Sequence, residues 1–146
     1  MWARTGCSTF AGGRFSCVTG DCGDAVACNG SGGATPATLV EVMLNVTQDY
    51  YDISLVDGFN LPVSVSPQGG SGANCTQSSC AANVNSVCPS ELTVKGTDGS
   101  VAACKSACTA FLLPQYCCTD AFSTPTNCKA TNYSSIFKND CPQAYS

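Results

Sequence analysis

Thirteen cysteines among 146 residues constrain this chain more than any other feature. A share of roughly nine per cent is typical of domains held together by disulfides. A zinc site built only from cysteines is the competing interpretation, but no C-x-x-C pair occurs, and the adjacent Cys117 and Cys118 suit bridges in irregular loops better. We therefore predict a disulfide scaffold from an oxidising compartment, with no metal and no cofactor.

The rest of the composition excludes several functional classes. The chain has no histidine, which removes the Ser/His and Cys/His nucleophilic arrangements and the commonest metal ligand. A net charge of −4 with six basic residues argues against binding to nucleic acid. No apolar run is long enough for a transmembrane segment. We expect one domain that is a monomer. Because an export signal is not visible and the cysteine count is odd, we also expect a fragment.

Residues 38–67 are free of cysteine and have the pattern of β-strands. Apolar and polar side chains alternate from Thr38 to Asn45 and again from Tyr51 to Val56, with the period of two of half-buried strands. Asp57-Gly58 follows as a turn. Glu41 and Asp52 then project from strand faces, and Asp57 lies at a corner. Three acids in a weakly charged chain favour a cleft, although a solvated outer face is equally consistent with the pattern.

The flanking regions are rich in cysteine. Residues 5–37 predict small loops and hairpins stapled by local bridges, and residues 68–79 a glycine-rich loop. Residues 80–141 contain eight cysteines and two predicted short helices, Ala102–Phe111 and Asn132–Lys138. The sequence thus predicts a mainly β fold in three parts: a small disulfide-rich subdomain at 5–37, sandwich strands at 38–79 and a larger disulfide-rich subdomain at 80–141.

Four N-x-S/T triplets are candidate glycosylation sites. They begin at Asn29, Asn45, Asn74 and Asn132.

Eight motifs occur in a specific order along the chain. They are WARTGC, TGDC, TLVEVMLN, YYDISLVDGFNLPVSVSP, CPSEL, QYCC, NYSSIFK and CPQAYS. Together they resemble the thaumatin-like proteins, the pathogenesis-related group of plant defence proteins. The resemblance covers essentially the whole chain. Family members have further strands before these motifs and a further segment with two cysteines after them, so the resemblance implies a thaumatin-like domain truncated at both ends.

The resemblance also implies a disulfide framework. Six pairs follow from the family pattern: Cys7–Cys17, Cys22–Cys28, Cys80–Cys141, Cys88–Cys104, Cys108–Cys117 and Cys118–Cys128. Cys75 is left unpaired, because the family partner of this cysteine belongs to the additional segment.

The implied fold is a β-sandwich beside disulfide-rich subdomains that carry short helices. In antifungal members, an acidic cleft lies between the sandwich and the larger subdomain. Mapped by motif, the cleft residues are Arg4, Glu41, Asp52, Asp57 and Gln143. Gln143 stands where the family pattern has an aspartate.

The function implied by the resemblance is defence through binding, and weak hydrolysis, of fungal β-1,3-glucan. Hydrolysis of a glycosidic bond needs an acid and a second carboxylate, and we assign these roles to Glu41 and Asp57. Arg4 would orient a carboxylate by a bidentate contact, or the charges would only stitch the sheet together. Tyr51 and Phe59 would stack on sugar rings or belong to the core.

Two other functions stay open at this point. One is a non-catalytic antifungal or glucan-binding protein, and the other is an inactive truncated gene product with unpaired sheet edges. For the full-length parent, the resemblance implies secretion to the apoplast.

Overall fold

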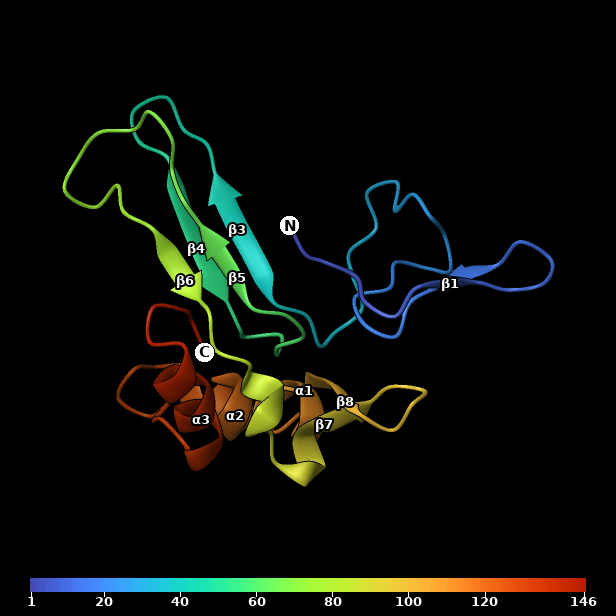
Figure 1. The fold of residues 1–146 in the computed structure, drawn as a ribbon. Helices are drawn as coiled ribbons and strands as arrows, with labels where there is room; N and C mark the ends of the chain where they lie inside the picture. Colours follow the sequence, from blue (N-terminus) through green and yellow to red (C-terminus); the bar gives the residue numbers. More distant parts are fainter.

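A computed structural model describes all residues from 1 to 146 and consists of short elements joined by long loops (Figure 1). The β-strands are β1 (Ser8–Thr9), β2 (Phe15–Ser16), β3 (Leu39–Met43), β4 (Tyr50–Ser54), β5 (Val63–Val65), β6 (Ser78–Cys80), β7 (Thr93–Lys95) and β8 (Val101–Cys104). The α-helices are α1 (Ala107–Phe111), α2 (Pro114–Cys117) and α3 (Asn132–Asp140). Short 3₁₀ turns lie at Val84–Ser86, Ser90–Leu92 and Asp120–Phe122.

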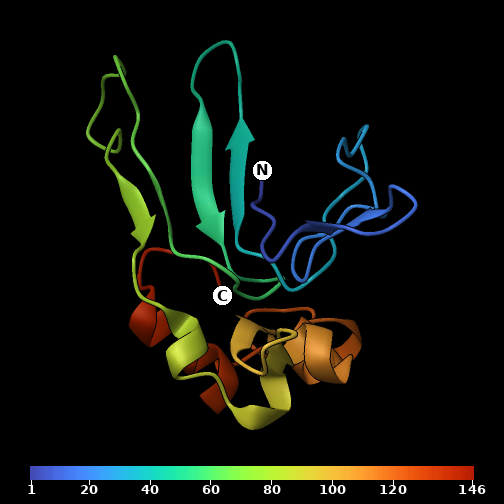
Figure 2. The same cartoon turned by 45° about the vertical axis from the view of Figure 1, so that its right-hand side comes forward.

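The strands form four antiparallel pairs, β1–β2, β3–β4, β5–β6 and β7–β8. In Figure 2 the β3–β4 hairpin stands between the β5–β6 hairpin and the N-terminal loops, with the helices below. The predicted strands at residues 38–65 are confirmed as β3, β4 and β5, but β6 was not predicted. A complete β-sandwich is not formed by these four pairs, so the sandwich stays a prediction.

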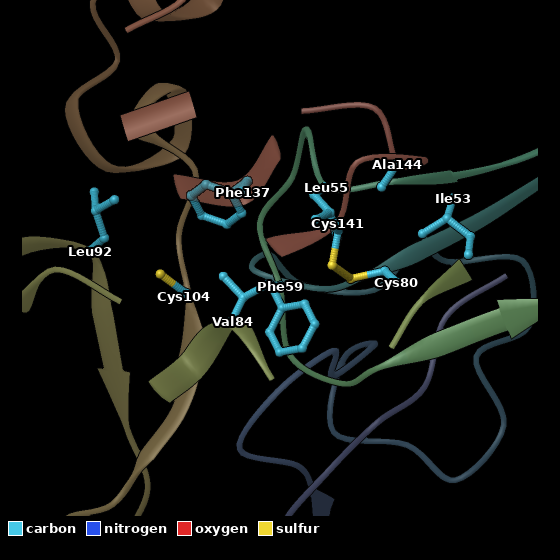
Figure 3. Close-up of a cluster of buried hydrophobic side chains, with 10 residues drawn as sticks. All are labelled: Ile53, Leu55, Phe59, Cys80, Val84, Leu92, Cys104, Phe137, Cys141 and Ala144. Atoms are coloured by element: carbon cyan, nitrogen blue, oxygen red, sulfur yellow. A yellow bond between two sulfur atoms is a disulfide. The ribbon is translucent and has the colours of Figure 1, made fainter. Parts of the chain in front are cut away.

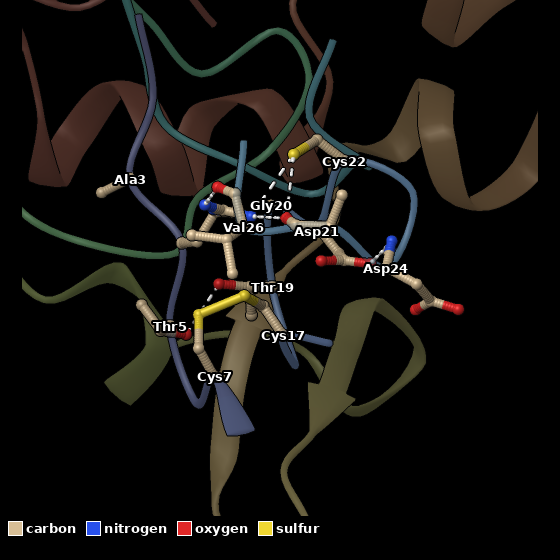
Figure 4. The surroundings of a disulfide bond; sticks show 12 residues. Ala3, Thr5, Cys7, Cys17, Thr19, Gly20, Asp21, Cys22, Asp24 and Val26 are labelled. Atoms are coloured by element: carbon tan, nitrogen blue, oxygen red, sulfur yellow. Dashed lines mark hydrogen bonds between the residues drawn. A yellow bond between two sulfur atoms is a disulfide. The ribbon is translucent and has the colours of Figure 1, made fainter. Parts of the chain in front are cut away.

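The N-terminal region is a set of loops around two local disulfides, and Figure 4 shows the surroundings of the first of them, Cys7–Cys17. Cys7–Cys17 closes the β1–β2 hairpin and Cys22–Cys28 closes the next loop. The hydroxyls of Thr5 and Thr19 are hydrogen-bonded at 2.7 Å beside the first bridge. Because no residue of this region belongs to the main core, cross-links and hydrogen bonds hold its shape.

The hydrophobic core lies where the lower end of β4 meets the disulfide-rich region (Figure 3). Its ten buried residues are Ile53, Leu55, Phe59, Cys80, Val84, Leu92, Cys104, Phe137, Cys141 and Ala144. The disulfide between Cys80 and Cys141 joins β6 to the end of α3 within this core. Core packing therefore holds the segment from Ile53 to Phe59, whereas the far end of the β3–β4 hairpin lies outside the core.

Six disulfides are present, and they join the same cysteine pairs that the resemblance implies. Cys75 is a free, half-buried cysteine in the loop before β6.

The helical region differs from its prediction in two places. Residues 102–104, predicted as the start of a helix, belong to strand β8 because they pair with β7. The helix begins only after Ser106, whose hydroxyl accepts a hydrogen bond from the Thr109 amide as an N-cap. The prediction of α3 is confirmed, but the cap is Thr131, whose side chain and that of Ser134 form a capping box.

Candidate acidic pocket

Glu41 and Asp52 lie directly opposite each other on β3 and β4. Opposite residues in an antiparallel pair point to the same face, with Cβ atoms about 4.5–5.5 Å apart. The neighbouring pair of Val40 and Ile53 points to the other face, which leads to the core. The two carboxyl groups thus share the face of the hairpin that turns away from the core.

Asp57 reaches the same side of the molecule from the corner between β4 and β5. A turn closes there, because the Gly58 amide donates to the Leu55 carbonyl at 2.8 Å. Gly58 has a φ of 102°, and an added Cβ would lie 2.5 Å from the Cys104 carbonyl oxygen. Only glycine fits this close approach, so the predicted Asp57-Gly58 turn is confirmed with a specific cause.

Glu41 and Asp57 line one pocket with a volume of about 470 Å³. The lining residues are Met1, Trp2, Gly32, Gly33, Leu39, Val40, Glu41, Val42 and Asp57, and we call this site the acidic pocket. Glu41 is exposed and its carboxyl group makes no hydrogen bond within the protein, whereas Asp57 is half-buried. The two residues chosen from the sequence as an acid pair are therefore brought to one concave surface.

Trp2 is a pocket residue that the sequence did not single out. Its Nε1 donates a hydrogen bond to the Gly20 carbonyl at 2.8 Å, and its backbone bridges to Leu39 of β3. A Cβ on Gly33 would lie 2.2 Å from the same Nε1, so the indole packs directly on the glycine backbone. The one feature of the sequence that could have indicated Trp2 is that it is the only tryptophan of the chain. An indole on a pocket wall is suited to contact the apolar faces of sugar rings.

Arg4 does not take part in the acidic pocket. Its guanidinium donates hydrogen bonds to the carbonyls of Ala25 and Val26 at 2.7 and 2.5 Å, and it lies 5.1 Å from the ring centroid of Phe15. The single ion pair of the structure is Arg14–Asp24, in the N-terminal loops. Both hypotheses for Arg4, the bidentate carboxylate contact and the charge cluster that stitches the sheet, are therefore wrong. The side chain instead fixes the loop closed by Cys22–Cys28.

Gln143 lies outside the acidic pocket as well. Its side-chain oxygen accepts hydrogen bonds from the amide and the hydroxyl of Ser79 in β6, at 2.9 and 3.1 Å. Gln143 thus links the chain after α3 to β6, next to the Cys80–Cys141 disulfide. In this position the amide has a structural role, and its lack of charge does not alter the lining of the pocket.

The two aromatic residues predicted to stack on sugars are placed elsewhere. Phe59 is fully buried in the core, so its ring is inaccessible to a ligand. Tyr51 lies on the face of β4 opposite to Asp52, and its hydroxyl donates to the Thr76 carbonyl at 2.6 Å. Stacking beside the acids is therefore wrong for both residues, and Trp2 is the aromatic side chain that lines the pocket.

Asp52 has an unusual environment within the hairpin. One of its carboxyl oxygens, Oδ1, is buried without a hydrogen-bond partner. A buried acceptor without a partner is costly to desolvate, so a structure retains one for a specific reason. Although Asp52 is opposite Glu41, it is not among the residues that line the acidic pocket.

The four glycosylation candidates, Asn29, Asn45, Asn74 and Asn132, are all exposed. None of the helices combines the length and the apolar character needed to cross a bilayer.

Comparison with known proteins defines the relationships of the chain. The model of the thaumatin family matches residues 1–146. Thaumatin-like protein 1 of Pyrus pyrifolia is 58% identical over 149 aligned residues, which cover the whole chain and 61% of that protein. A Prunus avium protein named glucan endo-1,3-beta-glucosidase is 62% identical, with 60% of its length covered. Thaumatin-like protein 1b of Malus domestica is 62% identical, with 70% covered.

The chain thus spans about 60% of the length of the first two relatives. A family match over every residue, together with six disulfides, leaves no doubt about its relationship. The chain belongs to the thaumatin family.

Proposed function

We propose that the protein is a plant defence protein that binds fungal β-1,3-glucan in the acidic pocket and hydrolyses it slowly. The observation that carries this proposal is the meeting of Glu41 and Asp57, from two separate segments, in one pocket of about 470 Å³. The name of the Prunus avium relative, glucan endo-1,3-beta-glucosidase, supports the choice of substrate. Six disulfides support secretion, since such bonds persist in oxidising compartments.

The chemistry follows from two carboxyl groups on either side of a glycosidic bond. Glu41, in its protonated form, donates its proton to the leaving oxygen of the glucan. Asp57, ionised, attacks the anomeric carbon or takes a proton from the attacking water. Trp2 offers an aromatic wall on which a glucose ring can rest.

A non-catalytic glucan-binding protein is the second candidate, and one observation favours it. Glu41 is exposed and has no hydrogen-bond partner that fixes its carboxyl group. Catalysis depends on groups that are preorganised around the reacting bond, and a mobile acid supplies little of that advantage. Binding requires less exact placement, so the same pocket would retain the glucan without turning it over.

The experiment is a laminarin assay with wild type and two isosteric variants, Glu41→Gln and Asp57→Asn. The catalytic proposal expects release of reducing ends by wild type and a loss of at least about 100-fold in each variant. Asp140→Asn, at the end of α3, is the matched control and should keep the wild-type rate. Retention on insoluble glucan without release of reducing ends would support the binding protein and contradict hydrolysis.

The proposal also includes the division of the fold into a sandwich and two disulfide-rich subdomains. We propose that β3–β6 are part of a thaumatin-type sandwich, between a small disulfide-rich subdomain at 5–37 and a larger one at 80–141. The positions of the core and of the Cys80–Cys141 disulfide, at the junction of the last two parts, support this division.

A further inference from the structure

A second concave surface lies on the disulfide-rich region and shares no lining residue with the acidic pocket. It consists of two adjoining cavities of about 650 and 540 Å³. Both cavities are lined by Gln115, Tyr116, Lys129, Ala130 and Thr131. The cavities therefore form one continuous depression between α2 and the start of α3, which we call the α2–α3 groove.

Aromatic rings form one wall of the α2–α3 groove. Tyr116 and Tyr133 have ring centroids 5.8 Å apart, and Phe111 packs behind them at 5.4 and 5.3 Å. Phe122 lines the same cavity as the two tyrosines. Each of these rings is only half-buried, so the cluster is fixed by its own contacts and still presents apolar surface to a ligand.

The polar groups of the groove include neutral amides. The side chains of Gln115, Asn127 and Asn132 line its outer cavity, and none of the three is buried. Gln115 makes no side-chain hydrogen bond within the protein, so both its donor and its acceptor are free. Asn127 is held by a hydrogen bond from its Nδ2 to the Ala121 carbonyl at 2.8 Å. The groove thus offers two free amides, of Gln115 and Asn132, and one oriented amide, of Asn127, beside the aromatic wall.

Carboxyl side chains are absent from the lining of the groove, although the chain contains ten acidic residues. Lys138 lines the inner cavity but donates its ammonium hydrogen bond to the Ala144 carbonyl at 2.9 Å. Lys129 remains at the junction, exposed and without an ion-pair partner. Without an acid and a second carboxylate, the groove lacks the groups that cleave a glycosidic bond.

We propose that the α2–α3 groove binds a neutral linear oligosaccharide without cleaving it. Aromatic rings cover the apolar faces of sugar rings, and amides exchange hydrogen bonds with sugar hydroxyls, as concave ligand sites combine the two. The protein would then hold a glucan chain at two places, the acidic pocket and the groove. This inference rests on the proposed function only for the choice of a glucan as the probe.

The test is a titration of the ¹⁵N-labelled full chain with a β-1,3-linked glucohexaose, followed by amide chemical shifts. The protein is made in a host without N-glycosylation, so that Asn132 carries no sugar. Saturable shifts are expected at residues 115–117 and 127–133, and they should persist in the double variant Glu41→Gln/Asp57→Asn. Tri-galacturonate, an anionic probe, separates sugar recognition from simple attraction to Lys129.

Two variants measure the contribution of the groove. Gln115→Ala should weaken the binding about five-fold, the equivalent of one neutral hydrogen bond. Phe122→Ala should weaken it about ten-fold through loss of an aromatic wall. Gln68→Ala and Phe10→Ala make the same changes at exposed sites elsewhere and should leave the affinity unchanged.

Each outcome of the titration decides between the proposals. If the groove does not respond while residues 39–42 and 57 shift, the groove proposal is overturned and the acidic pocket is supported. If only the groove responds, the groove is supported and glucan binding in the acidic pocket is contradicted. A response of the groove to the anionic probe alone would overturn recognition of a neutral sugar.

Discussion

The β3–β4 hairpin and the disulfide-rich region from Cys80 to Cys141 are stabilised by different interactions. The disulfide-rich region contains four internal disulfides and six of the ten core residues, Cys80, Val84, Leu92, Cys104, Phe137 and Cys141. The far end of the hairpin has no cross-link. There Met43, Leu44 and Val46 are exposed by 64, 78 and 99%.

This difference explains where the two proposed sites lie. The acidic pocket uses the lower part of the hairpin, where Trp2 and the Asp57 corner pack against it. The α2–α3 groove lies among cross-linked loops, where Cys108–Cys117 and Cys118–Cys128 line its inner cavity. Strand pairing therefore positions the residues of the acidic pocket, whereas disulfides fix the shape of the α2–α3 groove.

Removing the Cys80–Cys141 disulfide should have the largest effect. The bond closes a loop with a sequence separation of 61, which predicts a loss of about 4 kcal/mol in the double variant Cys80→Ala/Cys141→Ala. Cys118→Ala/Cys128→Ala, with a separation of 10, should cost about 3 kcal/mol. Urea unfolding followed by circular dichroism measures both. Equal losses would show that loop length does not govern the contribution.

Truncation of a buried and of an exposed residue of the hairpin should lower the free energy of unfolding by different amounts. Ile53, at the lower end of β4, is fully buried, so Ile53→Ala should lower the free energy of unfolding by about 3 kcal/mol. Val42 is 47% exposed, and Val42→Ala should cost less than about 1 kcal/mol. A similar cost for both variants in urea unfolding would contradict the position of the core.

Gly58→Ala tests the corner that positions Asp57. The added Cβ would meet the Cys104 carbonyl oxygen and the side chain of Pro36 at a φ of 102°. We expect a loss of about 2 kcal/mol in the free energy of unfolding, together with lower laminarin hydrolysis because Asp57 is displaced. Gly69→Ala is the control, since it has a positive φ but nothing within 4 Å. Equal losses would show that backbone strain alone, and not the close approach, matters at Gly58.

A charge at the tip of the hairpin should change association rather than stability. Val46→Lys and Leu44→Lys place ammonium groups among exposed apolar side chains, which should reduce self-association in light scattering. The free energy of unfolding should change by less than about 0.5 kcal/mol. Light scattering that is unchanged by both substitutions would show that this surface does not drive association. That result would argue against the hypothesis that the chain is an inactive product that aggregates.

The smallest expected effect concerns Glu91 beside the α2–α3 groove. Its own backbone amide and the hydroxyl of Tyr133, at 2.9 Å, lower the pKa of Glu91. Because a lowered pKa stabilises the folded state above the pKa of the unfolded chain, this contribution is lost as the pH falls through the folded value. Tyr133→Phe should raise the pKa of Glu91 in a ¹³C NMR titration. An unchanged titration would contradict the hydrogen bond.

Much of the fold could be predicted from local patterns and from the resemblance. Alternation placed β3 and β4, and the Asp57-Gly58 dipeptide placed the corner. Residues 102–104 were misassigned because alanine favours a helix locally, whereas pairing with β7 decides the structure. The strand β6 was missed because Ser78, Ser79 and Cys80 carry no apolar alternation.

The site was harder to predict, since it depends on contacts between distant segments. Glu41 and Asp57 meet as expected, but Arg4 binds carbonyls 21 and 22 residues away in the sequence. Gln143 binds Ser79, at a separation of 64 residues. The role of Trp2 depends on its contact with Gly33 and its bridge to Leu39, and no local pattern indicates such packing.

The most direct test of the acidic pocket uses Trp2, the one tryptophan of the chain, as its reporter. Its fluorescence is excited selectively while a β-1,3-glucohexaose is added to the Glu41→Gln variant, which should bind without turnover. If the acidic pocket binds the glucan, the Trp2 emission should change and the change should saturate. Retention of the variant on insoluble β-1,3-glucan with no change in Trp2 emission would place the glucan elsewhere and contradict binding in the acidic pocket.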